Sequence, residues 1–382
     1  MNAFPTPRRR RIGVAVGRYA RKRLAIAVAT LAAASVAASP AGAGSTLVAA
    51  DCFDRRTQPY TSQVDGHLHF RPFGGKAIPF DEVVSYLRKS GVHHANIFGI
   101  GQKLPADSDC TYYLDCPGTP VLPSIKNDVV NGENYLESQP TDPHLTLSMT
   151  SFDVANPETI PADLAMYDEE FPGQFRWGGE LNVVKAALFH NHHEPTTPED
   201  INQWANFMTV LEERNIPLTL HSDLGNDQHP AKYLHLLERV LDRYPRNKIV
   251  WAHMGLSKEL ATMDPRVHIA ITKRLLDEHP NLTLDLSWRV LHDQYFTKPA
   301  VRRLYATFLN AYPSRAIPGT DFVASANKDY AVYKEELEVT SRINKDLSDE
   351  AFRGIALGQN YFDLLGLKDR APLICRARPA TG

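Results

Sequence analysis

The sequence lacks three features that would each indicate a particular class of protein. None of its four cysteines forms a C-x-x-C pair, so a cysteine-based zinc site is not predicted. Its 42 basic and 44 acidic residues leave a net charge of −2, without the positive excess typical of nucleic-acid-binding proteins. The apolar run at residues 24–38 is shorter than the roughly 20 residues that a membrane-spanning helix needs. Histidine and carboxylate side chains therefore become the main candidates for chemistry.

The first 43 residues have the composition of an export signal. Eight basic residues, all before position 24, precede the uncharged run rich in Ala and Val, and small-residue cleavage patterns follow at residues 41–43 and 48–50. We predict a cleaved signal peptide over residues 1–43 and a periplasmic or secreted location, with no stable membrane span after cleavage. An uncleaved membrane anchor is the alternative.

Removal of residues 1–43 makes the remaining chain clearly acidic. It keeps 34 basic and 44 acidic residues, a net charge of −10. Such a surface repels phosphate backbones, so we do not expect nucleic acid as a partner. A small-molecule substrate is expected instead, and a homo-oligomer is left open.

From residue 62 the chain alternates strand and helix patterns eight times, as a parallel sheet with crossover helices does. We predict a distorted (β/α)8 TIM-type barrel of the α/β class over residues 62–367, after a lead-in at 44–61 and before a tail at 368–382. The predicted strands are residues 62–70, 93–101, 145–154, 175–184, 216–224, 248–255, 282–290 and 316–322. The predicted helices are residues 81–89, 157–170, 199–214, 231–244, 265–278, 299–311, 329–343 and 350–365.

The connection after the second strand is unusually long. Residues 101–144 are rich in Pro, Asp, Asn and Gly and contain Cys110 and Cys116. Because this segment follows the carboxyl end of a barrel strand, we predict a lid over the active-site face. A variable surface insertion is the alternative.

The cysteines are even in number, which suggests disulfides in an exported protein. Cys110 and Cys116 flank a short loop, and Cys52 and Cys375 lie near the two ends of the mature domain. Four cysteines allow three pairings. We predict Cys110–Cys116 and, because the ends of a barrel meet where its sheet closes, Cys52–Cys375.

Polar side chains stand near the ends of four predicted strands. His67 and His69 alternate with apolar residues in V-D-G-H-L-H-F, so both imidazoles project from one face of the first strand. His221, His253 and Asp321 close the fifth, sixth and eighth strands. In a barrel these ends converge, and two imidazoles at i and i+2 can share one divalent cation.

These motifs resemble the amidohydrolase superfamily, specifically the branch that includes aminocarboxymuconate-semialdehyde decarboxylase-like enzymes. The resemblance is based on D-G-H-L-H-F, L-T-L-H-S-D, V-W-A-H-M-G, P-G-T-D-F and the closing L-G-Q-N-Y-F-D-L-L-G-L. It implies a barrel with one or two divalent metals, held by His67, His69, His221 and Asp321. It also implies that His253 is a second-metal ligand or an acid/base and carbonyl-polarising group.

The fourth strand leaves the metal count open. In binuclear relatives a Glu or a carbamylated Lys on this strand bridges two metals, and this chain offers both Glu180 and Lys185. Residues five apart on a regular strand lie on opposite faces, so both can point inward only if the strand contains a bulge. We favour Glu180, because G-G-E-L resembles the equivalent strand of metal-dependent deoxyribonuclease-like relatives.

The ligand types suit zinc, with manganese or iron also compatible. We expect hydrolysis of an ester, lactone or amide bond by a metal-activated water, with Asp321 as the base and His253 stabilising the oxyanion. Trp288 and Arg289 at the end of the seventh strand, and Lys126 in the long loop, are candidates for substrate binding. The alternatives are a metal-dependent decarboxylase of an unsaturated or aromatic acid and a non-catalytic metal- or ligand-binding barrel.

Overall fold

The computed structural model describes residues 52–104, 110 and 116–375. Parallel strands follow one another around a curved sheet in chain order. They are β2 (Val64–His69), β3 (His94–Phe98), β6 (His144–Met149), β7 (Phe175–Val184), β8 (Leu218–Ser222), β9 (Ile249–Trp251), β10 (Leu282–Asp285), β11 (Ala316–Ile317) and β12 (Phe322–Val323). Most of their residues are apolar and buried on both faces, as expected for a parallel sheet covered by helices.

The eighth barrel strand is broken in two, and its two parts close the sheet. β11 pairs with β10, whereas β12 pairs with β2 at the other end of the strand order. Between them, the Asp321 amide donates to the carbonyl of His67 at 2.7 Å. Gly319 is required in this segment, because a Cβ there would lie 2.8 Å from the Cβ atoms of His67 and Ser287. The predicted barrel is confirmed.

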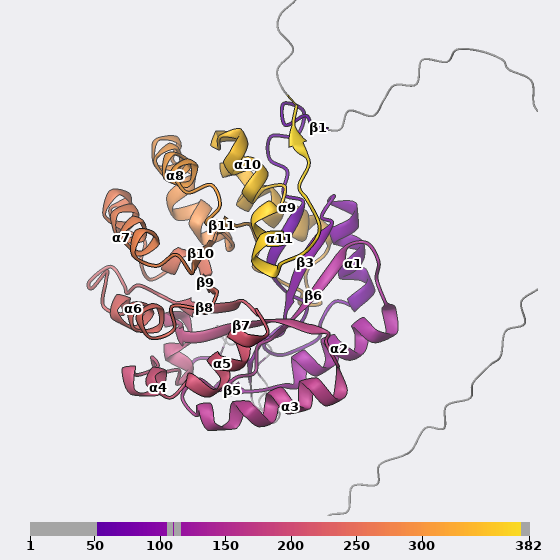
Figure 1. The fold of residues 1–382 in the computed structure, drawn as a ribbon, viewed down its shortest axis with the longest axis vertical. Coiled ribbons are helices and arrows are strands. Elements are labelled where there is room, and N and C mark those ends of the chain that lie inside the picture. The colour runs from indigo at the N-terminus through magenta and orange to yellow at the C-terminus, as the bar shows by residue number, and fades with distance from the viewer. Residues whose placement is uncertain (1–51, 105–109, 111–115, 376–382) are drawn as a thin grey trace, which may run out of the picture. The chain divides into compact units, whose positions relative to one another are not determined.

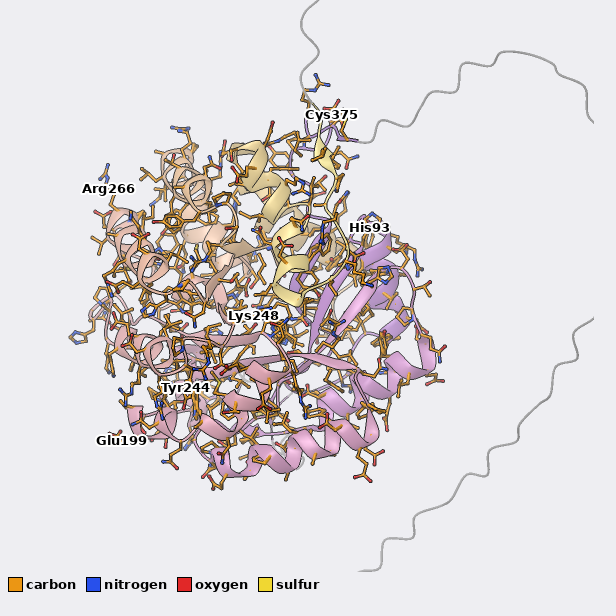
Figure 2. All side chains as sticks on the ribbon, in the orientation of Figure 1. His93, Glu199, Tyr244, Lys248, Arg266 and Cys375 are labelled. Carbon is orange, nitrogen blue, oxygen red and sulfur yellow. A yellow bond between two sulfur atoms is a disulfide. The ribbon has the colours of Figure 1, made fainter. Side chains whose placement is uncertain are left out.

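Helices surround the strands in Figure 1. Their apolar faces pack on the sheet; in α6, for example, Leu236, Leu237, Val240 and Leu241 are buried. The helices are α1 (Phe80–Lys89), α2 (Lys126–Ser138), α3 (Ile160–Glu170), α4 (Pro198–Asn202), α5 (Ala205–Glu213), α6 (Leu234–Arg243), α7 (Pro265–Glu278), α8 (Pro299–Ala311), α9 (Tyr330–Thr340), α10 (Asp349–Ile355) and α11 (Gln359–Leu365). Glu199 of α4 and Arg266 of α7 project from the periphery (Figure 2).

Several details differ from the sequence-based prediction. The helix predicted over residues 199–214 is two helices, α4 and α5. Residues 101–144 are not one long loop, because α2 fills their second half and packs against β6. The predicted last helix is two helices, α10 and α11, separated at Gly358, whose φ of 89° a helix cannot accommodate. Strand β9 ends at Trp251 because His253 and Met254 have positive φ. The Gly, Asn and polar content of residues 126–138 concealed the helix from pattern analysis.

Two disulfides are present, with the predicted pairings. Cys52 and Cys375 are bonded with a Cα–Cα distance of 4.9 Å, and Cys110 and Cys116 with one of 5.8 Å. Beside the first bond, β1 (Cys52–Phe53) pairs with β13 (Leu373–Ile374), and Cys375 lies at this edge in Figure 2. Disulfides indicate an oxidising compartment.

In the described part of the chain, no helix is both long and apolar enough to cross a membrane. The predicted signal peptide at residues 1–43 lies outside the described residues.

Candidate metal centre

Four side chains from three parts of the barrel meet at the carboxyl ends of its strands. His67 and His69 come from β2, Glu180 comes from β7, and Asp321 precedes β12. The Nε2 atoms of His69 and His67 lie 3.2 and 3.5 Å from Asp321 Oδ1, and 3.4 and 3.7 Å from Glu180 Oε2. Two ligands of one tetrahedral ion, each about 2 Å from it, lie roughly 3.3 Å apart. His67, His69 and Glu180 form one group whose ligand atoms all lie within 4.8 Å of one another, and His67, His253 and Asp321 form another. Each group could hold a divalent ion, and the two share His67.

The hydrogen bonds of the histidines orient them toward this point. Nδ1 of His67 donates to Asp285 at 2.6 Å, and Nδ1 of His69 donates to the carbonyl of Gly99 at 2.6 Å. Each ring therefore presents the lone pair of Nε2 to the centre. His67 Nε2 is buried without a hydrogen-bond partner among the described residues. Buried polar atoms normally have a partner, so this nitrogen is available to bind a metal.

A second group of nitrogen atoms faces the other oxygen of Glu180. His221 Nδ1 contacts Glu180 Oε1, and His253 Nε2 lies 3.7 Å from it. The other nitrogen of His221 lies 3.0 Å from Asp223, and His253 Nδ1 donates to the carbonyl of Ser287 at 3.3 Å. The implied ligand set placed His221 with His67, His69 and Asp321; in the structure it groups instead with Glu180 and His253. The carboxylate of Glu180 thus stands between two sets of donors.

Lys185 also points into the centre. β7 has two irregularities in its register with β8, one between Gly178 and Leu181 and one between Asn182 and Val184. These bulges place Glu180 and Lys185 on the same side of the strand, and Lys185 Nζ donates to Glu180 Oε1 at 3.2 Å. The alternation rule alone would have put Lys185 among the outer helices.

The charges of the site keep its carboxylates ionised. Burial raises the pKa of Glu180, but the charges of Lys185 and His221 outweigh burial and hold that pKa well below its ordinary value. Burial likewise opposes ionisation of Asp321, yet its contact with His69 and the nearby charge of His253 lower its pKa. Both groups are therefore in the form that binds cations.

A cavity of about 660 Å³ opens from the centre. The side chain of Asp321 is 15% exposed at its floor. Trp288, with φ of 73°, stands against the cavity and packs on His253 with a ring separation of 4.9 Å. Such a volume suits a small molecule.

The other predicted substrate-binding residues differ in their surroundings. Arg289 lines the cavity, but its guanidinium is paired with Asp293 at 2.9 Å and Glu335 at 3.3 Å. Lys126 is exposed at the start of α2 and does not line the cavity. From the predicted lid, Gly101 and Gln102 line the cavity, whereas residues 105–109 and 111–115 lie outside the described part.

The structure adds one residue that the sequence analysis had passed over. Asp223 contacts His221 and also accepts from the amide of Ala186 at 2.7 Å, which joins the ends of β7 and β8. Its position two residues after His221 was a usable signal, because i and i+2 share one face of a strand.

Residues 155–358, more than half of the chain, match the family described as Amidohydrolase (Amidohydro_2). This chain belongs to the amidohydrolase family. Among curated proteins, none matches its sequence.

Solved structures with a similar fold share little sequence with this chain. A protein from Agrobacterium tumefaciens is 13% identical with a TM-score of 0.50, over 84% of this chain and 96% of that one. A zinc-bound amidohydrolase from Burkholderia multivorans is 14% identical with a TM-score of 0.48, over 80% and 99%. The dihydroorotase of Campylobacter jejuni is 15% identical with a TM-score of 0.48, over 81% and 84%. The first of these similarities supports the barrel fold.

Proposed function

We propose that this amidohydrolase is an exported, metal-dependent hydrolase of an ester, lactone or amide bond in a small molecule. The observation that carries the proposal is the convergence of His67, His69, Glu180 and Asp321, with the buried Nε2 of His67 left without a hydrogen-bond partner among the residues that the structure describes. The two disulfides support an oxidising location outside the cytoplasm.

His67, His69, Asp321 and Glu180 would hold a divalent ion, for which zinc suits the nitrogen and oxygen donors. When bound, such an ion supplies a water of lowered pKa and polarises the carbonyl of the substrate. Asp321 is the residue placed to move a proton, since its ionised carboxylate is part of the centre and borders the cavity. It accepts the proton of the attacking water and returns it to the leaving group.

Trp288 lines the cavity, and the buried His253 packs against its ring. The Nε2 atom of His253 has no hydrogen-bond partner among the described residues, and Ser287 holds the opposite nitrogen of the ring. His253 can therefore contact the oxygen on which negative charge develops. Trp288 covers the rings of His221 and His253, which excludes water from that side.

Removal of the metal is the first test. Purified protein stripped with a chelator should be inactive on a panel of lactones, esters and amides, and zinc or manganese should restore turnover. An unsaturated carboxylic acid belongs in the panel as the competing substrate class. Release of carbon dioxide from it, with no hydrolysis of any other compound, would replace the hydrolase by a decarboxylase.

Asp321→Asn separates catalysis from metal binding. The amide keeps the size and one oxygen but cannot accept a proton near neutral pH, and general-base catalysis contributes typically about 10²–10⁴-fold. We expect kcat to fall by that factor, with metal content measured on the same sample. A variant that retains both metal and near wild-type turnover would remove Asp321 from the role of base.

A further inference from the structure

We propose that the ammonium group of Lys185 occupies the second cation position of the centre, so that the protein binds one divalent ion and not two. The inference rests on the metal centre proposed above. The single ion would bind at Oε2 of Glu180 and not at Oε1. Lys185, a buried lysine without a part in the hydrolytic mechanism, would then determine the number of ions bound.

The two oxygens of Glu180 have different neighbours. Oε2 faces the Nε2 atoms of His67 and His69, and these nitrogens also face Asp321. His67, His69 and Glu180 form one group of possible ligands, with Asp321 beside both histidines, and no lysine or arginine is hydrogen-bonded to Oε2 among the described residues. Oε1, by contrast, already has Lys185 Nζ as a donor at 3.2 Å.

Lys185 is held in this place by the fold. The residue is only 9% exposed, and the bulge between Asn182 and Val184 turns it inward. Its backbone amide donates to His193 Nε2 at 3.1 Å, which fixes the chain where the side chain leaves it. Within the described part of the chain, Glu180 Oε1 is the one hydrogen-bond acceptor of Nζ. An unpaired buried charge is energetically costly, so the fold places an ionised partner beside this buried lysine.

Apart from Lys185, the groups around Oε1 are two histidines that could bind a metal with it. His221 has a carboxylate at each ring nitrogen, Glu180 at Nδ1 and Asp223 at Nε2. Nε2 of His253 is then the one nitrogen of this group without a hydrogen-bond partner in the described residues. An ammonium has three donors and no lone pair, so Lys185 repels a divalent ion at Oε1 and does not bind it.

Metal stoichiometry tests the inference without any substrate. Protein stripped of metal is titrated with zinc alone, dialysed, and analysed for bound zinc per chain by mass spectrometry. The wild-type protein should retain one ion. Lys185→Met keeps the length of the side chain and removes the charge, so this variant should retain two ions. Lys185→Arg keeps the positive charge and should retain one.

Lys258→Met is the matched control. Lys258 lines the same cavity, but it is exposed, and Glu180 accepts a hydrogen bond from Lys185 and not from Lys258. Its loss should therefore leave one ion bound. Circular dichroism checks that each variant is folded, and Lys185→Gln replaces Lys185→Met if the latter is not.

Two zinc ions on the wild-type protein would overturn the inference while leaving the proposed hydrolase intact. The same holds for a folded Lys185→Met that retains one ion, and for an intact mass showing carbon dioxide added to Lys185, which would make the side chain an anionic ligand. Wild-type protein that binds no zinc would instead overturn the proposed function.

Discussion

The residues that face the centre are each oriented by a contact at their far side. Asp285 holds His67, the carbonyl of Gly99 holds His69, and Ser287 holds His253. These contacts decide which ring nitrogen carries the proton and therefore which one is available to a metal. At the scale of single residues, we therefore expect the affinity for a metal ion to depend also on groups that do not touch it.

Asp285→Asn should therefore weaken metal binding without removing a ligand. An amide is a poorer acceptor than a carboxylate and no longer stabilises the His67 ring in one tautomer, and loss of such a partner typically costs about 10–100-fold in metal affinity. Competition for zinc against a chromogenic chelator measures the change. Asp293→Asn, which removes a partner of Arg289 at the cavity rim, is the control and should leave the zinc affinity unchanged. Equal affinities for wild type and Asp285→Asn would contradict this role.

At the scale of elements, a buried carboxyl connects α2 to its neighbours. Asp128 accepts from the amide of Thr150 at 2.7 Å, from the amide of Ser151 at 3.1 Å and from the hydroxyl of Tyr167 at 2.6 Å. It thereby ties α2 to the segment after β6 and to α3. Gly99 packs against the same carboxyl, since a Cβ there would meet Asp128 Oδ1 at 2.0 Å. The helix thus supports the loop whose carbonyl orients His69.

Because Asp128 is buried, we expect the stability of the protein to fall as the pH rises. Burial raises its pKa from 3.8 to about 6, against the opposing effect of its hydrogen bonds. Because the folded-state pKa is the higher one, its stabilising contribution is complete below about pH 4 and is lost as the pH rises to about 6. The shift corresponds to about 3 kcal/mol in the free energy of unfolding.

The comparison with Asp128→Asn isolates this effect, because the amide does not titrate. Urea unfolding of both proteins between pH 4 and 7 should show the wild type losing stability relative to the variant up to about pH 6, and a constant difference above it. All other titrating groups are common to the two proteins and cancel. A difference that is the same at every pH would mean that Asp128 ionises normally.

At the scale of the whole molecule, the first and last described residues are joined covalently. The Cys52–Cys375 disulfide spans 323 residues, whereas Cys110–Cys116 spans six. A crosslink stabilises chiefly by reducing the entropy of the unfolded chain, and the effect grows with the length of the closed loop. The first bond therefore contributes to global stability, and the second mainly shapes one loop.

Cys375→Ser should lower the free energy of unfolding by about 2–5 kcal/mol, and Cys110→Ser by less. Denaturant unfolding gives both values, with Cys52→Ser expected to match Cys375→Ser. Zinc binding should persist in all three variants, because His67, His69, Glu180 and Asp321 lie in the barrel strands or directly beside them, away from the four cysteines. A larger loss from Cys110→Ser than from Cys375→Ser would reverse the assignment.

The order of strands and most helices could be predicted because their signals lie in consecutive residues. Both disulfides could be predicted from the positions of the four cysteines in the chain. The apolar periodicity that marks α7 and α8 is visible in consecutive residues, and their ends match the prediction. α2 was missed because its helix has little apolar periodicity and is held largely by polar contacts, such as those of Asp128. Pattern analysis detects amphipathic faces and has no access to buried hydrogen bonds.

The sequence by itself determined the barrel and the convergence of His67, His69 and Asp321, because strand periodicity and the parallel order of strands bring those side chains to one end. Only the tertiary structure decided how Glu180 and Lys185 share that space. Their common orientation depends on bulges in the pairing of β7 with β8, and a bulge is a property of two strands in contact. The same bulges determine which donors face each of the two oxygens of Glu180.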